Sequence, residues 1–338
     1  MKKIKGIIGL CILILAVVWM HTDAAAGEPY EKIANDSEWK VLKIVNKERI
    51  KQGLEPVSMF ADLQAAAGVR ADEIKDYFSH ERPDGSAWST AISEEGINYG
   101  WAGENIAAGY TSPSDVMNGW MNSPGHRSNI QGKNFDHIGV GYCTGGSYGK
   151  NWVQLFVGGC KVKSVSADME KGTVNYPVGT TIDQMDRYLV VRCNKHGIGY
   201  VPVTSGMCSG YNSNKTGYQT ITVKYHGKKV KIPVTVGKSS VYKMPSKVTG
   251  VKVTKNIKNN VKLSWKKRGG AGYEVWVSTS KNGAFKKTNT LTGSKKTTCK
   301  VKNLKSGKNY YIKVRAYKKV KNKKIYGLFS KAVVVKTK

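Results

Sequence analysis

The last third of this 338-residue chain has almost no acidic side chains. From Met244 to Lys338 there is one acid, Glu274, against 27 lysines and arginines. Residues 30–160, in contrast, hold 12 basic and 16 acidic residues, so the formal net charge of +32 comes from the back of the chain. A surface of this sign attracts polyanions at long range, whatever fold carries it.

Several motifs of known chemistry are absent as well. There is no C-x-x-C pair, which disfavours a zinc cluster of thiolates. There is also no serine elbow of the G-x-S-x-G type: residues 145–149 have that spacing, but they lie in the glycine-rich turn of a predicted hairpin and not between a strand and a helix. No Arg-Gly-Asp tripeptide is present, which excludes integrin binding by that route. We identify no nucleic-acid module, and this argues against nucleic acid as the polyanion.

Only the start of the chain contains a long apolar run. Lysines precede the apolar stretch 7–20, and three alanines follow it as a small-residue cleavage site. We therefore predict a cleaved signal peptide over residues 1–26 and an exported protein, secreted or extracellular, with no transmembrane span after cleavage. The alternative is an uncleaved membrane anchor, for which the apolar run is short. We find no LPxTG sorting signal, so retention on the cell is expected to depend on charge or on such an anchor.

Export permits disulfides, and five cysteines follow the signal peptide. Four of them fall into two pairs that are close in sequence, which suggests the bridges Cys143–Cys160 and Cys193–Cys208. Spacing alone does not test the geometry of either bridge. The fifth, Cys299, alternates with apolar residues and is predicted to be a small buried core residue.

The length of the chain suggests two or three domains. In the first segment, apolar residues at helical spacing predict three helices, and alternation around a glycine-rich turn predicts a hairpin after them. The predicted helices span 39–50, 58–78 and 114–122, and the predicted hairpin strands span 138–143 and 151–157.

Two histidines follow these predicted helices. The second helix, with Ser58 as its N-cap, places His80 at its C-terminal end. Pro124 and Gly125 stop the third helix, and this is expected to hold His126 on a turn rather than on a helical face.

The two remaining segments are predicted to be all-β. In the middle segment, apolar residues alternate with polar ones on both sides of a turn at His226. In the last segment, alternating strands lead into a stretch that places Tyr310 like the tyrosine corner of a β-sandwich. Lysines crowd the turns and outward positions of these strands, where they also discourage edge-to-edge aggregation.

Four stretches of the first segment resemble, in order, the motifs of the CAP superfamily, which comprises cysteine-rich secretory proteins, antigen 5 and plant pathogenesis-related proteins. The bacterial branch of the family is the most similar, and the resemblance covers about residues 36–158. The stretches are YFSHERPDG (77–85), GENIAAG (103–109), WMNSPGHRSNI (120–130) and FDHIGVGYC with WVQLF after it.

The middle segment resembles a bacterial immunoglobulin-like (Ig-like) domain, and the last segment resembles a fibronectin type III domain. Together these resemblances imply an α+β chain, with a CAP-type α-β-α sandwich followed by two all-β sandwich domains. The expected boundaries are 1–26 for the signal peptide, 36–160 for the CAP (SCP-like) domain, 161–240 for the Ig-like domain and 245–338 for the fibronectin type III domain.

The central cavity of the CAP family presents two histidines and two glutamates. Three of these positions carry over to His80, Glu104 and His126. The fourth, a glutamate on the helix before the last histidine, has no counterpart, since Asp115 is the one acid in that helix. The resemblance therefore implies a cleft in which His126 faces His80 and Glu104.

Three kinds of chemistry remain open for this cleft. The imidazoles of His80 and His126 can hold a divalent cation such as zinc, with a carboxylate and a position left for a nucleophilic water. Without a metal, Glu104 could act as a base beside a histidine. Alternatively, the three side chains fix the shape of a ligand pocket by hydrogen bonding to loops. We therefore assign no catalytic residue.

Further residues have a less direct connection with the cleft. His137 precedes a predicted strand and either joins the cleft or lies on the surface. Arg127 either binds an anionic ligand or forms a surface ion pair. His196 and His226 are interpreted as exposed loop residues.

We expect a secreted or cell-surface-associated bacterial protein that binds a ligand or metal in its cleft. Its basic β-sandwich modules would attach it to an anionic cell-wall polymer, such as wall teichoic acid, or to an acidic glycan. The alternative is a metal-dependent hydrolase that acts on peptide or cell-envelope substrates.

Overall fold

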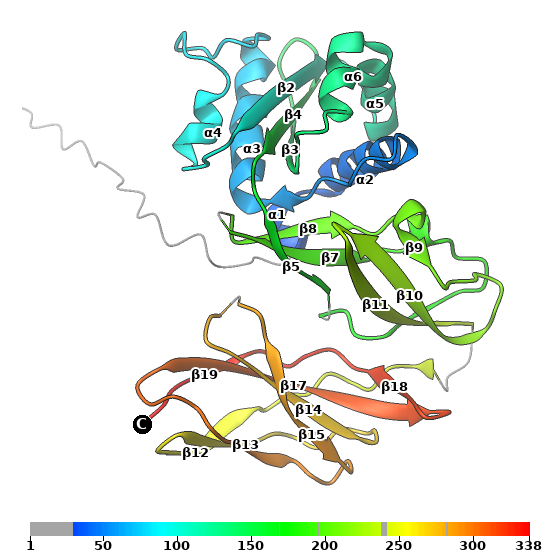
Figure 1. Ribbon diagram of the computed structural model, residues 1–338, viewed down its shortest axis with the longest axis vertical. Helices are drawn as coiled ribbons and strands as arrows, with labels where there is room; N and C mark the ends of the chain where they lie inside the picture. The colour runs from blue at the N-terminus through cyan, green and yellow to red at the C-terminus, as the bar shows by residue number, and fades with distance from the viewer. Residues whose placement is uncertain (1–29, 169, 195, 238–241, 282) are drawn as a thin grey trace, which may run out of the picture.

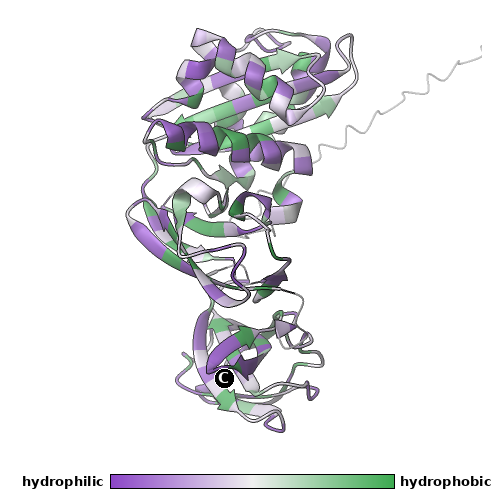
Figure 2. Cartoon of the chain, turned by 90° about the vertical axis from the view of Figure 1, so that its right-hand side faces the viewer, coloured by the Kyte–Doolittle hydropathy of each residue, from purple (hydrophilic) through white to green (hydrophobic). Residues whose placement is uncertain are grey.

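The computed structural model describes most of the chain after the predicted signal peptide; residues 1–26 themselves lie outside the described residues. Three parts are stacked along the long axis, an α/β part followed by two β parts (Figure 1). The view turned by 90° shows the same order (Figure 2). Within the described residues, no helix is long and apolar enough to cross a membrane. The structure describes residues 30–168, 170–194, 196–237, 242–281 and 283–338.

The first part, residues 30–160, is built on the antiparallel sheet β2-β4-β3. Helices cover both faces of this sheet, so the predicted α-β-α sandwich and the α+β class are confirmed. The helices are α1 (Tyr30–Ile33), α2 (Asp36–Lys51), α3 (Ala61–Asp76), α4 (Thr90–Glu94), α5 (Pro113–Asn122) and α6 (Pro124–Ile130). The strands are β1 (Met59–Phe60), β2 (Trp101–Ala108), β3 (His137–Thr144) and β4 (Lys150–Gly158).

Alternation along β4 explains how one sheet supports two helical layers. Trp152 and Phe156 belong to the apolar cluster that includes α2, α5 and α6. Val153, Leu155 and Val157 belong to the cluster of α3 and α4. Successive side chains of a strand point to opposite faces, so a continuously apolar strand can be covered on both sides. Strand β4 is therefore the centre of both cores.

Two glycines of β3 let α3 lie directly on the sheet. A Cβ at Gly139 would come within 2.2 Å of the Leu63 carbonyl oxygen, and one at Gly141 within 2.0 Å of the Ala67 carbonyl oxygen. Glycine inside a strand is unfavourable unless another backbone approaches this closely. The G-V-G of the fourth family motif thus fixes the position of α3, and with it the residues that follow α3.

Two predicted features of the helices are wrong. Ser58 does not cap α3: the two residues after it pair as β1, and the Ser58 hydroxyl instead lies 2.7 Å from Nδ1 of His137. Pro124 does not leave a turn but begins α6, because proline is favoured at the first helical position, where its missing N–H would be unpaired anyway. His126 therefore lies in the first turn of a short helix.

The second part, residues 161–237, is all-β, as predicted. Its strands form two sheets, β1-β8-β7-β5 and β6-β11-β10-β9, and the first of these includes β1 from the first part. The predicted turn at His226 joins β10 to β11. The elements are β5 (Val162–Ala167), β6 (Val174–Tyr176), η1 (Ile182–Gln184), β7 (Tyr188–Cys193), β8 (Ile198–Pro202), η2 (Ser205–Met207), β9 (Cys208–Ser209), β10 (Gly217–Tyr225) and β11 (Lys228–Val236).

The first and second parts share apolar packing as well as a sheet. Tyr188 and Tyr200 of the second part belong to the core cluster of the first, and Phe60 belongs to the core cluster of the second. Tyr30 stacks on Tyr188 with ring centroids 4.0 Å apart. Apolar area removed from water on both sides of a boundary favours a fixed arrangement over independent motion. The two parts therefore form one continuous unit.

A disulfide also joins these two parts, and it overturns both predicted bridges. Cys160 is bonded to Cys193 with Cα atoms 6.3 Å apart, while Cys143 and Cys208 are free. Cys143 pairs with Asn151 at the start of β4, whereas Cys160 follows the far end of that strand, about 30 Å away. Cys193 and Cys208 lie in different sheets. Closeness in sequence therefore did not mean closeness in space, because extended strands separate each predicted pair.

The third part, residues 242–338, is a second β-sandwich with the sheets β12-β13-β16 and β15-β14-β17-β18, and with β19 paired to β17. The Tyr310 hydroxyl accepts a hydrogen bond from the Lys305 N–H at 2.9 Å, which confirms the tyrosine corner. Cys299 is buried, as predicted. The strands are β12 (Lys252–Ile257), β13 (Asn260–Ser264), β14 (Gly272–Ser278), β15 (Lys286–Thr292), β16 (Thr298–Val301), β17 (Asn309–Val320), β18 (Lys323–Tyr326) and β19 (Val333–Lys336).

The third part meets the second through polar contacts. The Thr173 N–H donates to the Tyr326 carbonyl at 3.0 Å, and Lys313 pairs with Glu170 at 2.8 Å. No described strand of the third part joins a sheet of the second. This junction therefore lacks the shared sheet and the disulfide of the first junction.

Candidate ligand-binding site

Glu104 is the buried acid at the centre of the candidate site. It lies on β2, and its side chain is 1% exposed. A carboxylate at such a position needs a charged partner, and Arg70 of α3 supplies one, with Nε donating to Glu104 Oε1 at 2.8 Å. Glu104 is therefore held as a fixed anion against the helix.

His80 uses the other carboxylate oxygen of Glu104. Its Nδ1 lies 2.7 Å from Glu104 Oε2, while its side chain is 56% exposed. A carboxylate accepts hydrogen bonds, so the proton between the two atoms belongs to Nδ1, and in the neutral ring Nε2 is left as an acceptor. His80 and Glu104, which were predicted to share a cleft, are thus in direct contact, and this leaves Nε2 of a partly exposed imidazole available to a ligand.

Arg70 also fixes the chain on which His80 lies. Its side chain is fully buried, donates to the Ser79 carbonyl at 2.7 Å and pairs with Glu73. Glu73 in turn pairs with Arg82 at 2.7 Å, on the other side of His80. Charged groups that share hydrogen bonds in this way hold the residues on both sides of the exposed histidine.

Arg70 was not predicted as a residue of the site, although the sequence contains a signal for it. Arg70 follows Leu63 and Ala67 and precedes Ile74 at helical spacing, so it lies within the apolar face of α3. A charged residue in an apolar stripe is rarely buried without a partner. The position of Arg70 therefore predicts a buried acid nearby, and Glu104 is that acid.

His126 approaches the site from α6 on the other side of β2. Asn105 donates to the His126 carbonyl at 3.1 Å and to Gln154 at 2.9 Å, while Asn129 donates to the Glu104 carbonyl at 3.1 Å. Partial burial and the neighbouring His80 lower the pKa of His126. The neutral imidazole favoured by this shift is the form that binds metals and accepts hydrogen bonds.

The three predicted cleft residues are arranged around β2, but not as a compact metal cage. Glu104 has both oxygens engaged, by Arg70 and by His80. Within the described residues, one group of three His, Cys, Asp or Glu side chains has its possible ligand atoms within 4.8 Å of one another. That group lies elsewhere and contains none of these three residues. A cation at the site would therefore use the two imidazoles, with Glu104 as the group that orients His80.

Arg127 and His137 lie outside this arrangement. Arg127 donates to the Met121 carbonyl at 2.8 Å, near the end of α5, and its contact with an anionic ligand stays a prediction. His137 is 1% exposed, so the surface interpretation is wrong, and it packs against the second part instead of joining His80. Its neighbour His196 is also buried and lies 2.8 Å from Asp62, which overturns the interpretation of His196 as an exposed loop residue.

We call His137, Cys160 and Cys193 the junction cluster, because it lies where the first and second parts meet. The possible ligand atoms of these three residues lie within 4.8 Å of one another, and the two cysteines form the disulfide. The His137 ring contacts Phe60 with centroids 4.6 Å apart, and Nε2 lies 3.7 Å from the Cys193 sulfur. Burial lowers the pKa of His137 to about 3, so the ring is neutral.

Exposed aromatic side chains stand next to His80 in the sequence and were not predicted. Tyr77 and Phe78 are each 45% exposed, and the Phe78 ring lies 5.8 Å from that of Tyr148, which is 58% exposed. Aromatic faces left in water beside polar groups are typical of ligand-binding surfaces. They lie on the chain just before His80 and on the turn between β3 and β4.

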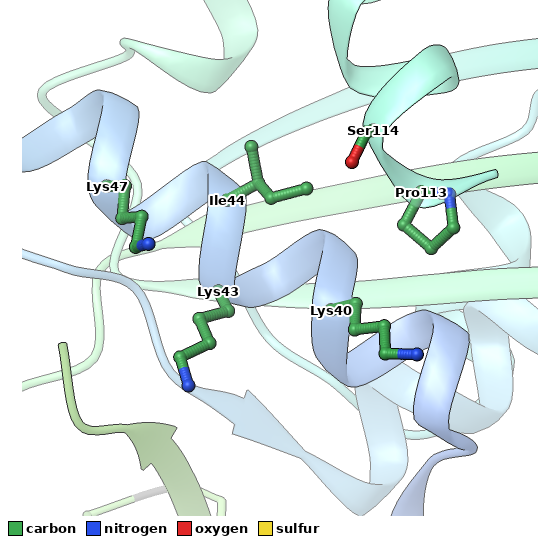
Figure 3. Close-up of a pocket in the computed structure, with 6 residues that line it drawn as sticks. All are labelled: Lys40, Lys43, Ile44, Lys47, Pro113 and Ser114. Atoms are coloured by element: carbon green, nitrogen blue, oxygen red, sulfur yellow. The ribbon is translucent and has the colours of Figure 1, made fainter. Parts of the chain in front are cut away.

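A separate groove lies between α2 and the start of α5 (Figure 3). Three lysines of α2 line it together with Pro113 and Ser114, but two of them are engaged at the junction: Lys43 donates to the Asp183 carbonyl, and Lys47 pairs with the Asp183 carboxylate at 3.2 Å. These contacts tie α2 to the second part. The residues that line the groove include none of the three predicted cleft residues, so it is separate from the histidine site.

Family models match all three parts of the chain in the predicted order. Residues 42–156 match the cysteine-rich secretory protein family (CAP), residues 173–236 match the bacterial Ig-like domain (group 3), and residues 246–326 match the fibronectin type III domain. The three resemblances stated from the sequence are thereby confirmed.

Similar proteins match over the first part. An uncharacterized protein of Bacillus subtilis, YkwD, is 44% identical over 123 residues, which are 36% of this chain and 47% of that protein. An uncharacterized membrane protein of the same organism, YlbC, is 31% identical over 120 residues, 35% of each chain. The match thus spans half or less of each relative. The solved structure of an extracellular protein containing a SCP domain from Bacillus anthracis is 26% identical, covers 40% of this chain and 45% of its own, and has a TM-score of 0.34.

Proposed function

Because the chain carries a domain of the cysteine-rich secretory protein family followed by an Ig-like and a fibronectin type III domain, we propose that it is an exported binding protein. Its first part binds a ligand or a divalent cation at His80 and His126. Its basic third part attaches it to an anionic polymer of the cell surface. The apolar start of the chain supports export, and its cleavage can be checked by the mass of the protein recovered from the culture medium.

The orientation of His80 carries the proposal for the first part. An exposed histidine normally samples several rotamers, but this one is held by a buried carboxylate, which is itself held by a buried arginine. Such a chain fixes Nε2 in space and costs desolvation of two charges. That cost is explained if His80 must meet a ligand in one orientation.

The residues fit a weakly held divalent cation better than a tightly held one. Two neutral imidazoles provide two nitrogen ligands, and the remaining positions would be filled by water or by a ligand. Glu104 strengthens such binding by fixing the tautomer of His80 rather than by direct ligation. The position of the family's second glutamate is vacant in this sequence, which also reduces the number of protein ligands.

Calorimetric titration of Zn²⁺ into the full chain near neutral pH tests this proposal. We expect one binding event that is lost in the His80→Ala/His126→Ala variant and kept in His226→Asn, which removes an imidazole from the second part. Glu104→Gln should weaken binding by about 10- to 100-fold, because it removes the acceptor that orients His80. Equal heats for the wild type and the double variant would contradict a cation at these residues.

The alternative, a metal-dependent hydrolase, is less well supported. A general base needs a free carboxylate oxygen within reach of a water, and both oxygens of Glu104 are engaged. Turnover of peptide or cell-envelope substrates that is lost in both His80→Ala and His126→Ala, with folding intact, would establish the hydrolase instead. Saturable binding without turnover would support the binding protein.

Charge supports the proposed attachment through the third part. Residues 244–338 hold one acid against 27 lysines and arginines, and the acid is fully buried. We expect the full chain to bind an anionic wall polymer with an affinity that falls steeply as salt is added. No retention at low ionic strength would contradict attachment by charge.

A further inference from the structure

The three-stranded sheet of the third part carries a row of lysines across all of its strands. Lys262, on the central strand β13, lies directly opposite Lys255 on β12 and Lys300 on β16. All three are exposed, whereas Val261 and Leu263, on either side of Lys262, are fully buried. The three lysines therefore lie on the outer face of the sheet, and we call them the lysine row.

A β-bulge brings a fourth lysine to the same face. Lys252 and Lys255 are three residues apart, and in a regular strand they would point to opposite faces. The pairing shifts between Val253 and Lys255, so Lys252 lies opposite Ser264 while Lys255 lies opposite Lys262. Both lysines are exposed. Bulges re-aim side chains, and this one adds positive charge beside the lysine row.

Without a bound anion, the lysine row is unfavourable for the stability of the folded protein. Like charges placed directly opposite each other on neighbouring strands destabilise a sheet, and Lys262 has such a neighbour on each side. Strands β12, β13 and β16 contain no aspartate or glutamate. None of the three lysines forms an ion pair with a described carboxylate; the ion pairs of the third part involve Glu274 and Glu170.

In the other sheet of the same domain, basic side chains pair with a buried acid. Glu274 on β14 is fully buried and pairs with Arg315 at 2.8 Å, with Lys324 at 3.1 Å and with Lys287 at 3.6 Å. The cations of that sheet therefore gather around an internal anion. The lysine row has no such anion, which indicates that its counter-charge comes from outside the chain.

Protection of sheet edges explains only part of the row. Lysines on edge strands discourage pairing with other chains, and β12 and β16 are the edges of this sheet. Lys262 is on the central strand, where both edges are already paired, so it has no edge to protect. A glutamate at that position would relieve the repulsion, yet a lysine is present.

We propose that the outer face of the sheet β12-β13-β16 is the binding site for a linear polyanion with phosphate groups in its repeat. Cross-strand neighbours are about 5 Å apart, so the lysine row spans about 10 Å and suits a polymer lying across the strands. Ser264 and Thr298 form the adjacent row with Lys252 and add hydroxyl donors. Lysine is a point charge that binds phosphate without the two-point geometry that arginine imposes. The inference rests on the proposed attachment and assigns it to one face.

The test measures binding of the full chain to long-chain inorganic polyphosphate over a series of salt concentrations. In the variant Lys255→Gln/Lys262→Gln/Lys300→Gln we expect affinity at 0.1 M salt to fall at least tenfold, and the slope of log affinity against log salt to decrease by about two to three. The matched control Lys281→Gln/Lys319→Gln/Lys331→Gln removes three exposed lysines outside this sheet and should lose less than threefold.

The outcomes separate this inference from the proposed attachment. Equal losses in the two triple variants would overturn the assignment to the lysine row while leaving attachment by total charge in place. No binding by the wild type would overturn both. Equal affinity of the wild type for polyglutamate and polyphosphate of matched charge would overturn the assignment of phosphate.

A single substitution tests the argument from repulsion. Lys262→Glu replaces two repulsive cross-strand pairs with two attractive ones, so thermal stability of the third part should rise while polyphosphate binding falls at least tenfold. Because the variant is expected to be more stable, lost binding cannot be attributed to unfolding. A lower melting temperature, or unchanged binding, would overturn the inference.

Discussion

His80 and His137 are fixed in the same way and used differently. Each has Nδ1 2.7 Å from a side-chain oxygen, that of Glu104 for His80 and that of Ser58 for His137. The Nε2 of His80 belongs to a side chain that is 56% exposed, whereas the Nε2 of His137 faces the Cys193 sulfur in a closed interior. Residue type and orientation are thus shared, and burial alone separates a group that can meet a ligand from one that holds two domains together.

The comparison also predicts which residues contribute to stability and which to the proposed binding. The junction cluster lies among apolar rings and a disulfide, so its loss should cost folding free energy. At the histidine site, the exposed His80 ring contacts the buried ion pair of Arg70 and Glu104. Substitution of His80 should therefore cost little stability, whereas substitution within the buried pair should cost much. Substitutions can test these differences, beginning with Arg70 of the buried pair.

Arg70→Ala should produce the largest change. It leaves the Glu104 carboxylate buried without its cation, which we expect to lower the free energy of unfolding by about 3–5 kcal/mol in urea titrations. The double variant Arg70→Ala/Glu104→Gln should recover part of this loss, because no unpaired charge remains. A loss below about 1 kcal/mol in Arg70→Ala would mean that the pair is not buried as described.

Removal of the disulfide should come next. The Cys160→Ser/Cys193→Ser variant releases a constraint between residues separated by 33 positions, and we expect a loss of about 3 kcal/mol. The matched control Cys143→Ser/Cys208→Ser removes two of the three described cysteines that are free, and it should lose less than about 1 kcal/mol. Peptide mapping without reduction should recover the linked Cys160 and Cys193 peptides. Recovery of Cys143 linked to Cys160 would restore the bridge predicted from spacing.

Some of the features behind these effects could be predicted from the sequence, and others could not. Periodicity located the helices and hairpin of the first part, because each face of an element repeats at its own spacing. The motif resemblance assigned His80, Glu104 and His126 to one cleft; His80 does contact Glu104, while the cleft shared with His126 stays a prediction. Both kinds of information are local.

Most of what failed depended on contacts between distant segments; the turn expected at Pro124 failed for a local reason, because Pro124 begins α6. Ser58 was expected to cap a helix. The two residues after it instead form β1, which pairs with β8 of the second part, and the Ser58 hydroxyl lies against His137. The partner of Cys160 lies in the second part for the same reason. A sequence treated as separate domains contains no signal for such a junction. Arg70 was the exception, since its place in an apolar stripe could have been noticed.

Substitution of each histidine by alanine compares the two groups directly. His137→Ala leaves a cavity beside Phe60 and removes the 2.7 Å partner of the Ser58 hydroxyl, and we expect a loss of about 2–3 kcal/mol. His80→Ala removes an exposed ring and should lose less than about 1 kcal/mol while abolishing binding of Zn²⁺. If the two variants lost equal stability, burial would not be the property that separates the two histidines.

The dependence of stability on pH should change by an amount similar to the loss in His137→Ala, and its sign follows from burial. The folded pKa of His137 is about 3, below its ordinary value of 6.5, so in acid the unfolded chain takes up a proton that the folded chain does not. The contribution of His137 is complete above pH 6.5 and is lost as the pH falls, by about 1.4 kcal/mol per pH unit. Urea titrations from pH 7 to pH 4.5 should therefore show a shallower loss in His137→Gln than in the wild type. His126→Gln should flatten the slope less, because His126 is only partly buried although its pKa is also lowered. Parallel slopes for the wild type and His137→Gln would mean that the junction opens to water before the chain unfolds.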